Sequence, residues 1–200
     1  KTGVMSTYAT GLYNTVFMTM HPLTGEIWGT EMAPGGPGDG DSPPDGINII
    51  KKGNDYGWPF CYGANIAVTQ FHLKENVISE PCVEPAKIPS TIDLPAHSGP
   101  LGITFLPSEG WPQEYSNDLL VMYHGPSTSA LGDGYRIVRI EMSPDGIPTG
   151  SVEPFMVGFA DSDGHVTGRP VDFLLGPKGT LFVSDDFSGR IYRVAWRGKR

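Results

Sequence analysis

Hydrophobic and polar residues alternate in short runs near the C-terminal end of the chain, and these runs predict β-strands. Between Gly168 and Val194, three runs rich in Val, Ile, Leu, Phe and Tyr are separated by segments that carry Gly, Pro, Asp or Ser. Those are the residues that tight turns favour. The stretch therefore predicts a β-meander with strands at Val171–Leu175, Thr180–Ser184 and Arg190–Val194.

The same order of strand, turn and strand occurs twice more, beginning at Val16 and at Leu101. Each copy has a turn that contains proline, a second strand that ends near an acidic residue or a histidine, and a third strand. A purely β unit that returns at intervals of roughly 70 to 85 residues is typical of a β-propeller, in which each copy forms most of one blade. The sequence therefore predicts an all-β fold, a β-propeller of which this chain holds about three blades.

Closed propellers have about four to eight blades. An arc of three blades would expose strand edges and one flank of its core. We therefore expect residues 1–200 to be part of a single propeller domain. The remaining blades would precede Lys1 or come from a partner.

Composition and charge support a β fold and exclude two classes of partner. The chain has 27 Gly and 19 Pro in 200 residues, and 18% of its residues are charged, which disfavours helices and supplies turns. The net charge is −8, and no run of Lys or Arg stands out before Arg197. Nucleic-acid binding is therefore not expected. No apolar segment is long enough to span a bilayer.

The two cysteines flank a polar, turn-rich insertion. In an oxidising compartment, Cys61 and Cys82 would close this insertion as a disulfide; the alternative is two unrelated thiols. The predicted disulfide favours an extracellular or periplasmic location.

Candidate chemistry gathers on one face of the predicted propeller. The first strand of a blade crosses to the opposite face and the second returns, so the loop that enters the first strand and the loop that leaves the second lie together. This reasoning brings polar side chains from distant positions to one face, which favours a functional site there. The residues are Asn14, Glu31, His97, His124, Arg169, Asp185 and Asp186.

The loop from Ala33 to Gly46 offers carboxylates and main-chain carbonyl groups, which suit a hard cation such as Ca²⁺. We expect Asp39 and Asp41, in the middle of this loop, to be solvated surface acids. The better metal candidates lie at the ends of the loop, where strands fix them. They are Glu31, Ala33, Pro34 and Asp45.

The histidines divide into two groups. His21 and His72 stand in turn or loop surroundings and are predicted to be solvated. His97 and His124 adjoin Gly- and Pro-containing segments on the proposed face, which favours one of them as a general base. The alternative is a structural role for each.

Two further segments have plain structural interpretations. Trp58, in the aromatic and turn-rich stretch Asn54–Pro59, is predicted to be a wedge that packs between blades, with a ligand platform as the alternative. The stretch Asp161–Gly164 is predicted to be an ordinary turn. No motif of acyl-enzyme, nucleotide or zinc chemistry is present.

Two motifs resemble the soluble quinoprotein sugar dehydrogenases, the glucose/sorbosone dehydrogenase family. The first is N-x-YGWP at Asn54–Pro59 and the second is GRPVD…GPxGxLxVSDD at Gly168–Asp186; the similarity extends over nearly all of the chain. Members of that family are six-bladed propellers that bind pyrroloquinoline quinone (PQQ) and Ca²⁺ on one face and oxidise an aldose at its C1 hydroxyl. The resemblance implies that this chain is the C-terminal half of such a propeller.

The resemblance also implies roles for named residues. Ca²⁺ would act as a Lewis acid on the quinone, His124 or His97 would accept the hydroxyl proton, and hydride would pass to PQQ. Ala33 and Pro34 match the pair whose carbonyl oxygens hold the ion. The residues that match cofactor-side positions are Asn14, His124 and Arg169.

The sequence departs from the family at two of its arginine positions. Tyr13 stands beside the cofactor where members usually have Arg, and Pro126–Ser129 replaces a Ser-Trp-Asn-Arg segment. Each lost charged hydrogen bond would weaken PQQ binding by about 1.5–3 kcal/mol. Two functions therefore stay open: a sugar dehydrogenase that passes electrons to a cytochrome or dye, and a non-catalytic propeller that binds carbohydrate or a protein. A lactonase-type metal centre is a third option, but its carboxylates are not found.

Overall fold

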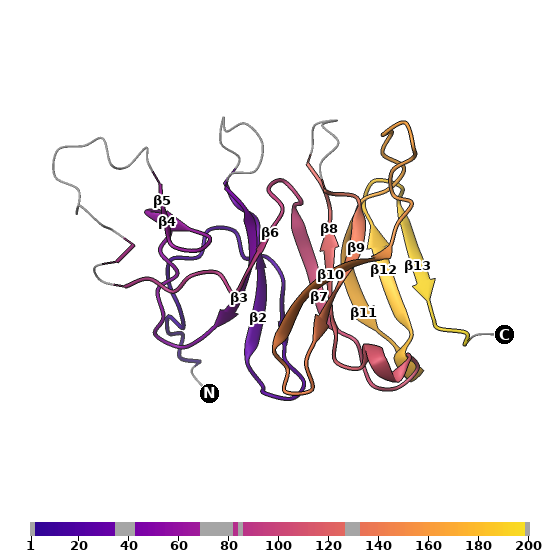
Figure 1. Ribbon diagram of the computed structural model, residues 1–200, viewed down its shortest axis with the longest axis horizontal. Helices are drawn as coiled ribbons and strands as arrows, with labels where there is room; N and C mark the ends of the chain where they lie inside the picture. Colours follow the sequence, from indigo (N-terminus) through magenta and orange to yellow (C-terminus); the bar gives the residue numbers. More distant parts are fainter. Residues whose placement is uncertain (1–2, 35–42, 69–81, 84–85, 127–132, 199–200) are drawn as a thin grey trace.

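The computed structural model describes residues 3–34, 43–68, 82–83, 86–126 and 133–198. Three antiparallel sheets stand side by side in sequence order (Figure 1), and the described residues contain no α-helix. The predicted all-β propeller architecture is therefore confirmed, with three blades among the described residues. The described residues contain no apolar helix of the length that a membrane span requires.

The first two blades have four strands each and the third has three. The first blade consists of β1 (Met18–Met20), β2 (Ile27–Glu31), β3 (Asp45–Ile50) and β6 (Ile92–Leu94). The second consists of β7 (Pro100–Phe105), β8 (Leu119–Tyr123), β9 (Arg136–Met142) and β10 (Pro148–Met156). The third consists of β11 (Pro170–Leu175), β12 (Leu181–Asp185) and β13 (Arg190–Val194).

The predicted C-terminal meander is confirmed as the third blade. Its strand β13 has the expected bounds, and β11 and β12 differ from theirs by one residue. Leu181, Val183 and Asp185 of β12 are buried, whereas the two residues between them are half-buried. This alternation has the period of two that a strand imposes.

The second blade lies at the centre of the hydrophobic core because the first blade covers one face of β8 and the third blade covers the other. All five residues of β8 are buried. Leu119, Val121 and Tyr123 belong to the cluster shared with the first blade, whereas Leu120 and Met122 belong to the cluster shared with the third. A strand buried on both faces reads as an unbroken apolar run, which is the pattern of this segment.

The last residues of β2, β8 and β12 lie at one end of the blades, together with the segments that enter β7 and β11 (Figure 1). We call this end the upper face. The opposite end carries short connections, among them the 3₁₀ turns Gln113–Tyr115 and Pro177–Gly179. The arrangement is the one that the sequence predicted for the loops with candidate chemistry.

The predicted disulfide between Cys61 and Cys82 is present, with a Cα–Cα distance of 5.7 Å. It joins Cys82 to a two-stranded hairpin, β4 (Cys61–Tyr62) and β5 (Ile66–Ala67), which lies beside the first blade (Figure 1).

The prediction of a solvated His21 is wrong. His21 is 1% exposed, and its Nδ1 accepts the N–H groups of Leu23 and Thr24 at 3.1 and 3.3 Å. Its ring packs against Phe105 and Trp28, with centroid distances of 4.5 and 5.7 Å. The imidazole supplies the acceptor that its turn needs and fills the space between two blades. His72 lies outside the described residues.

The close packing of the second and third blades gives a test of the fold. A Cβ atom on Gly102 of β7 would lie 2.8 Å from Asp172 Cα and 2.8 Å from Val171 O of β11. Backbone cannot yield as a side chain can, so we expect Gly102→Ala to lower the free energy of unfolding by about 1–3 kcal/mol. Gly46→Ala in β3 is the matched control, because a Cβ there would lie 3.6 Å from Ile92 O. Chemical denaturation measures both, and equal stability of the two variants would contradict the packing.

Candidate functional site

The predicted metal residues line one pocket of the upper face. Glu31, Ala33, Pro34 and Asp45 are all part of its wall. Its other side is aromatic and includes Tyr13, which the family resemblance implies to be a cofactor-side position. We call this the Glu31 pocket. The residues of its wall that the sequence analysis did not single out for a site include Asn48, Tyr62 and Ser90.

The Glu31 carboxylate is held by neutral donors. Its Oε1 accepts the Tyr13 N–H at 2.7 Å, and its Oε2 accepts Asn48 Nδ2 at 2.6 Å. Burial raises the pKa of Glu31, and these hydrogen bonds offset only part of that rise. The result is a desolvated carboxylate at the pocket wall, an environment that favours a nearby cation.

Asp45 serves the main chain of two loops. Its Oδ1 accepts the Ala33 N–H at 2.8 Å, and its Oδ2 accepts the Gly99 N–H at 2.8 Å and Ser98 Oγ at 2.9 Å. The residue is 2% exposed, and burial raises its pKa. Asp45 therefore fixes the loop that leaves β2 against the segment that enters β7, and both of its oxygens already have protein partners.

The aromatic side of the pocket is a ring pair. The centroids of Tyr13 and Trp58 lie 4.4 Å apart, and both residues line the Glu31 pocket. Trp58 is half-buried and belongs to neither of the two core clusters between described blades. Asn14, the neighbour of Tyr13, is half-buried, and its carbonyl accepts the Met32 N–H at 3.4 Å.

The two candidate bases stand on adjoining loops. The His124 N–H donates to Gly99 O at 3.0 Å, and the Gly125 N–H donates to Ser98 O at 2.8 Å. His97 is exposed and has a left-handed backbone, with φ of 62°. These main-chain hydrogen bonds join the loop of His124 to the segment that carries His97. Through Ser98 and Gly99, the loop of His124 is also connected to Asp45.

His124 is the more enclosed of the two histidines. Its side chain is 13% exposed, and its Nε2 lies 3.1 and 3.2 Å from the two carboxylate oxygens of Asp186. Burial lowers the pKa of His124, and the bond to Asp186 opposes this shift only in part. His124 is therefore predominantly a neutral imidazole at neutral pH.

Arg169 binds the same loop from the third blade. Its Nη2 donates to Gly125 O at 2.5 Å and its Nε donates to His124 O at 3.3 Å. A guanidinium has further N–H groups beyond the two that donate here. Among the described residues, Arg169 therefore joins two blades and has N–H groups left for another acceptor.

Asp185 fixes the turn that carries this group. Its Oδ1 accepts three main-chain N–H groups, from Arg169 at 3.0 Å, Phe187 at 3.0 Å and Ser188 at 2.9 Å. Its Oδ2 accepts Ser188 Oγ at 2.6 Å and Tyr192 Oη at 3.1 Å. Burial acts to raise the pKa of Asp185, but these donors outweigh it and the pKa is lowered.

The sequence placed Asp185 and Asp186 on this face but gave neither a role. The available signal was an acidic pair at the end of a predicted strand, directly before a Phe-Ser-Gly turn. At that position Asp185 accepts the N–H groups of the turn, and Asp186 contacts His124 of the second blade.

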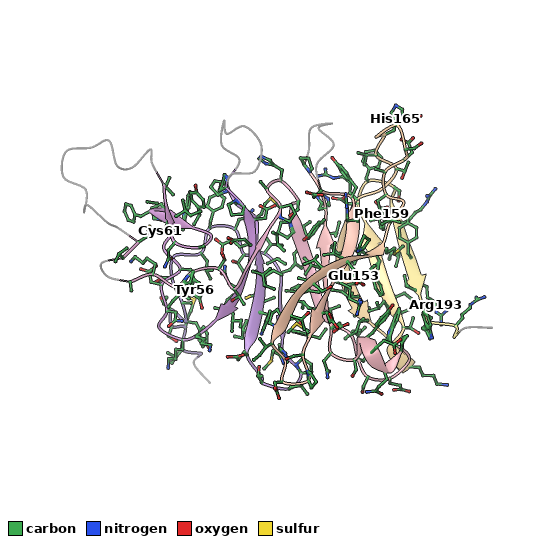
Figure 2. The ribbon with its side chains drawn as sticks, in the orientation of Figure 1. Tyr56, Cys61, Glu153, Phe159, His165 and Arg193 are labelled. Carbon is green, nitrogen blue, oxygen red and sulfur yellow. A yellow bond between two sulfur atoms is a disulfide. The ribbon has the colours of Figure 1, made fainter. Side chains whose placement is uncertain are left out.

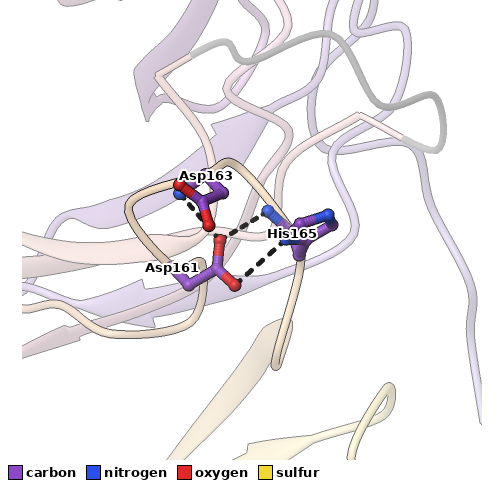
Figure 3. A group of neighbouring side chains, drawn as sticks. All are labelled: Asp161, Asp163 and His165. Carbon is purple, nitrogen blue, oxygen red and sulfur yellow. Dashed lines mark hydrogen bonds and ion pairs between the residues drawn. The ribbon is translucent and has the colours of Figure 1, made fainter.

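A third acidic group lies in the predicted turn at Asp161–Gly164. Asp161, Asp163 and His165 are all exposed, and their ligand atoms lie within 4.8 Å of one another (Figure 3). The Asp161 carboxylate accepts the main-chain N–H groups of Asp163 and His165 at 3.0 and 2.8 Å. The His165 N–H is the main cause of the lowered pKa of Asp161. The group is thus a turn that satisfies its own donors.

Two acids predicted to be solvated and one residue of the segment that departs from the family pattern cannot be placed. Asp39, Asp41 and Ser129 lie outside the described residues.

The comparison with known families decides the relationship. The sequence matches the TrAA12-like family over residues 3–197. The chain belongs to the TrAA12-like family. It is also 33% identical, over 195 residues, to an uncharacterized protein of Borreliella burgdorferi, a match that covers 97% of this chain and 50% of that protein.

Solved structures share the fold of this family member. The calcium structure of Trichoderma reesei Carbohydrate-Active Enzymes Family AA12 is 20% identical with a TM-score of 0.74, over 92% of this chain and 52% of that one. The holo form of the pyranose dehydrogenase PQQ domain from Coprinopsis cinerea is 19% identical with a TM-score of 0.67, over 94% and 55%. The chain thus spans about half the length of these relatives, and its fold is that of PQQ β-propeller proteins.

Asp185 gives a test of how the upper face is held. Asp185→Ala would leave three main-chain N–H groups without their acceptor, so we expect the free energy of unfolding at neutral pH to fall by at least about 3 kcal/mol. Because folding lowers the pKa of Asp185, its contribution is present above the unfolded-state pKa and is lost as the pH falls through the folded-state pKa. The difference in free energy of unfolding between the wild type and Asp185→Ala should therefore become smaller at acidic pH.

The matched control for this prediction is Asp145→Ala, which removes an exposed aspartate from a turn between β9 and β10. Denaturation curves across pH measure all three proteins. A loss in Asp185→Ala no larger than that in the control would contradict the assigned role.

Proposed function

We propose that this chain is part of a quinoprotein oxidoreductase that oxidises the C1 hydroxyl of an aldose or pyranose with Ca²⁺-bound PQQ. The observation that carries the proposal is the shared upper face, where the oxygen-lined Glu31 pocket and the group of His124 and Arg169 are linked by hydrogen bonds through Asp45 and Gly99. The names of the AA12 and pyranose dehydrogenase structures support the same activity class.

The donor set of the Glu31 pocket fits Ca²⁺. Hard cations prefer carboxylate and carbonyl oxygens, and the pocket wall offers Glu31 with the main chain of Ala33 and Pro34. The carboxylate is desolvated, and its hydrogen-bond partners among the described residues are neutral, so a divalent cation would supply the opposite charge. Asp45 would act by holding Ala33 in place.

The residues also fit PQQ. Arg169 keeps N–H donors for a carboxylate of the cofactor, where a planar guanidinium is the favoured partner. Tyr13 and Trp58 offer aromatic surface to a planar ring at the position where Arg was expected, and Asn14 lies beside them. When bound, PQQ accepts a hydride and Ca²⁺ polarises it as a Lewis acid.

His124 would accept the proton of the sugar hydroxyl. It is predominantly neutral at neutral pH because burial lowers its pKa, and a neutral imidazole has a free lone pair. His97, exposed on the adjoining loop, is the second candidate for this role.

The proposal extends to partners and location. Electrons would pass on to a cytochrome domain or another protein. The disulfide favours an extracellular or periplasmic protein.

A second function is favoured by the charges of the face. Tyr13 replaces an expected cation, and Glu31, Asp45, Asp185 and Asp186 are acidic. A non-catalytic propeller that binds carbohydrate or a protein through the same face would need no cation for a triply carboxylated cofactor.

Titration of the protein with PQQ in Ca²⁺ separates the two functions. We expect saturable binding, lost with a chelator, and reduction of the bound cofactor when an aldose is added. Arg169→Ala should weaken PQQ binding at least ~10-fold, since a charged hydrogen bond contributes about 1.5–3 kcal/mol. Arg193→Ala in β13 is the control. Arg193 is exposed and pairs with Phe182, near the end of β12 that lies away from Asp185 and Arg169. In Figure 2 it lies below the loop that carries His165.

Wild-type protein that binds no PQQ would overturn the dehydrogenase proposal and leave the binding function. If PQQ binds but Arg169→Ala and Arg193→Ala behave alike, the role of Arg169 is wrong.

A further inference from the structure

We propose that Asp186 is a positioning residue that holds His124 as the Nε2–H tautomer and leaves Nδ1 as the proton acceptor. The inference rests on the proposed function for its catalytic consequence, but the tautomer itself can be observed without any reaction.

The tautomer follows from the contacts of the imidazole. Both carboxylate oxygens of Asp186 lie near His124 Nε2, at 3.1 and 3.2 Å. An ionised carboxylate only accepts hydrogen bonds, so Nε2 must be the donor. A neutral imidazole carries one proton, and the lone pair is then on Nδ1.

Asp186 is held by the turn that its neighbour organises. The Asp185 carboxylate accepts the N–H groups of Phe187 and Ser188, which fixes the main chain on the C-terminal side of Asp186. Asp185 is 3% exposed, whereas the Asp186 side chain is 59% exposed. Asp186 is the first residue after β12 and belongs to the turn, where its side chain meets His124 of the second blade.

The contacts form a closed cycle of four residues. Asp186 binds the ring of His124, and the His124 carbonyl accepts Arg169 Nε. The Arg169 N–H then returns to Asp185, the chain neighbour of Asp186. Each bond in such a cycle restricts the others, so Asp186 helps to place both the ring of His124 and the guanidinium of Arg169.

Gly125 completes this arrangement because no other residue fits there. Its φ is +83°, and a Cβ atom would lie 2.6 Å from the Tyr135 ring. The Tyr135 hydroxyl donates to Pro126 O at 2.7 Å and keeps the ring in place. The Gly125 carbonyl is thereby set toward Arg169 Nη2.

Three charged groups act on the protonation of His124. Asp186 and Asp185 favour the charged imidazole, whereas Arg169 and burial disfavour it. His97 stands on the adjoining loop, one residue before Ser98. Loss of the Asp186 carboxylate should therefore lower the pKa of His124 further. It should also free the ring to adopt the other tautomer.

The test is NMR of the protein labelled with ¹⁵N-histidine, with His124→Asn used to assign the His124 resonances. The wild type should show a protonated Nε2 and an unprotonated Nδ1 at pH values above the pKa of His124. In Asp186→Asn the pKa should fall and the Nδ1–H tautomer should appear, and Asp186→Glu should restore both in part. An Nδ1–H tautomer in the wild type, or the same pKa in Asp186→Asn as in the wild type, would overturn the proposal.

A kinetic measurement tests the catalytic consequence. With PQQ, Ca²⁺ and an aldose, Asp186→Asn should lower kcat ~100-fold or more, the scale of general-base catalysis, with the acid limb of the pH profile shifted to lower pH. If Asp186 had only a structural role, its substitution would lower the stability of the protein without moving the acid limb of the pH profile. If kcat stays at the wild-type value, the positioning role in catalysis is overturned. If the wild type oxidises no sugar while the NMR result holds, the proposed function fails and the tautomer assignment stands.

Discussion

The upper face of this propeller depends on buried aspartates that accept main-chain N–H groups. Asp45 binds the N–H of Gly99 directly before β7, and Asp185 binds the N–H of Arg169 directly before β11. Loops at the end of a blade lack a neighbouring strand, so their N–H groups need another acceptor. A carboxylate can serve several at once, and in both places it ties a loop to a strand that the core already holds.

The two aspartates differ in how completely they are satisfied. Asp185 has five donors and a lowered pKa, whereas Asp45 has three and a raised pKa because burial outweighs them. The third blade is therefore anchored by a carboxylate that is stable as an anion. Around the Glu31 pocket two carboxylates are under-compensated, which is the electrostatic condition that favours a bound cation. A buried aspartate that accepts main-chain N–H groups thus anchors the third blade at Asp185 and adds negative charge beside the Glu31 pocket at Asp45.

Local patterns were sufficient to predict three strands of each blade and the faces, but not the fourth strands β6 and β10. The run Leu119–Tyr123 reads as a strand buried on both sides, and the alternation in β12 gives its buried side chains. The disulfide also followed from the sequence, because its two cysteines bracket a single insertion. These features depend on residues close together or on a period that the backbone imposes.

The contacts between residues of different blades could not be predicted from the sequence. His124 and Asp186 are 62 positions apart, and nothing in either segment indicates that one ring meets the other carboxylate. His21 was misjudged for the same reason, since a turn residue is buried only when another blade covers it, as Phe105 does here. Asp45 was predicted as a metal ligand from its type and position, but its loop partners could be seen only in three dimensions.

We propose that this scaffold gathers the oxygens of one cation site in the Glu31 pocket. Anomalous diffraction from crystals of the protein grown with Ca²⁺ tests it most directly, with crystals of Glu31→Gln as the control. We expect an anomalous peak bounded by Glu31 and the carbonyl oxygens of Ala33 and Pro34, and none at this place in the variant. A peak found only at the exposed group of Asp161, Asp163 and His165, or no peak at saturating Ca²⁺, would contradict it.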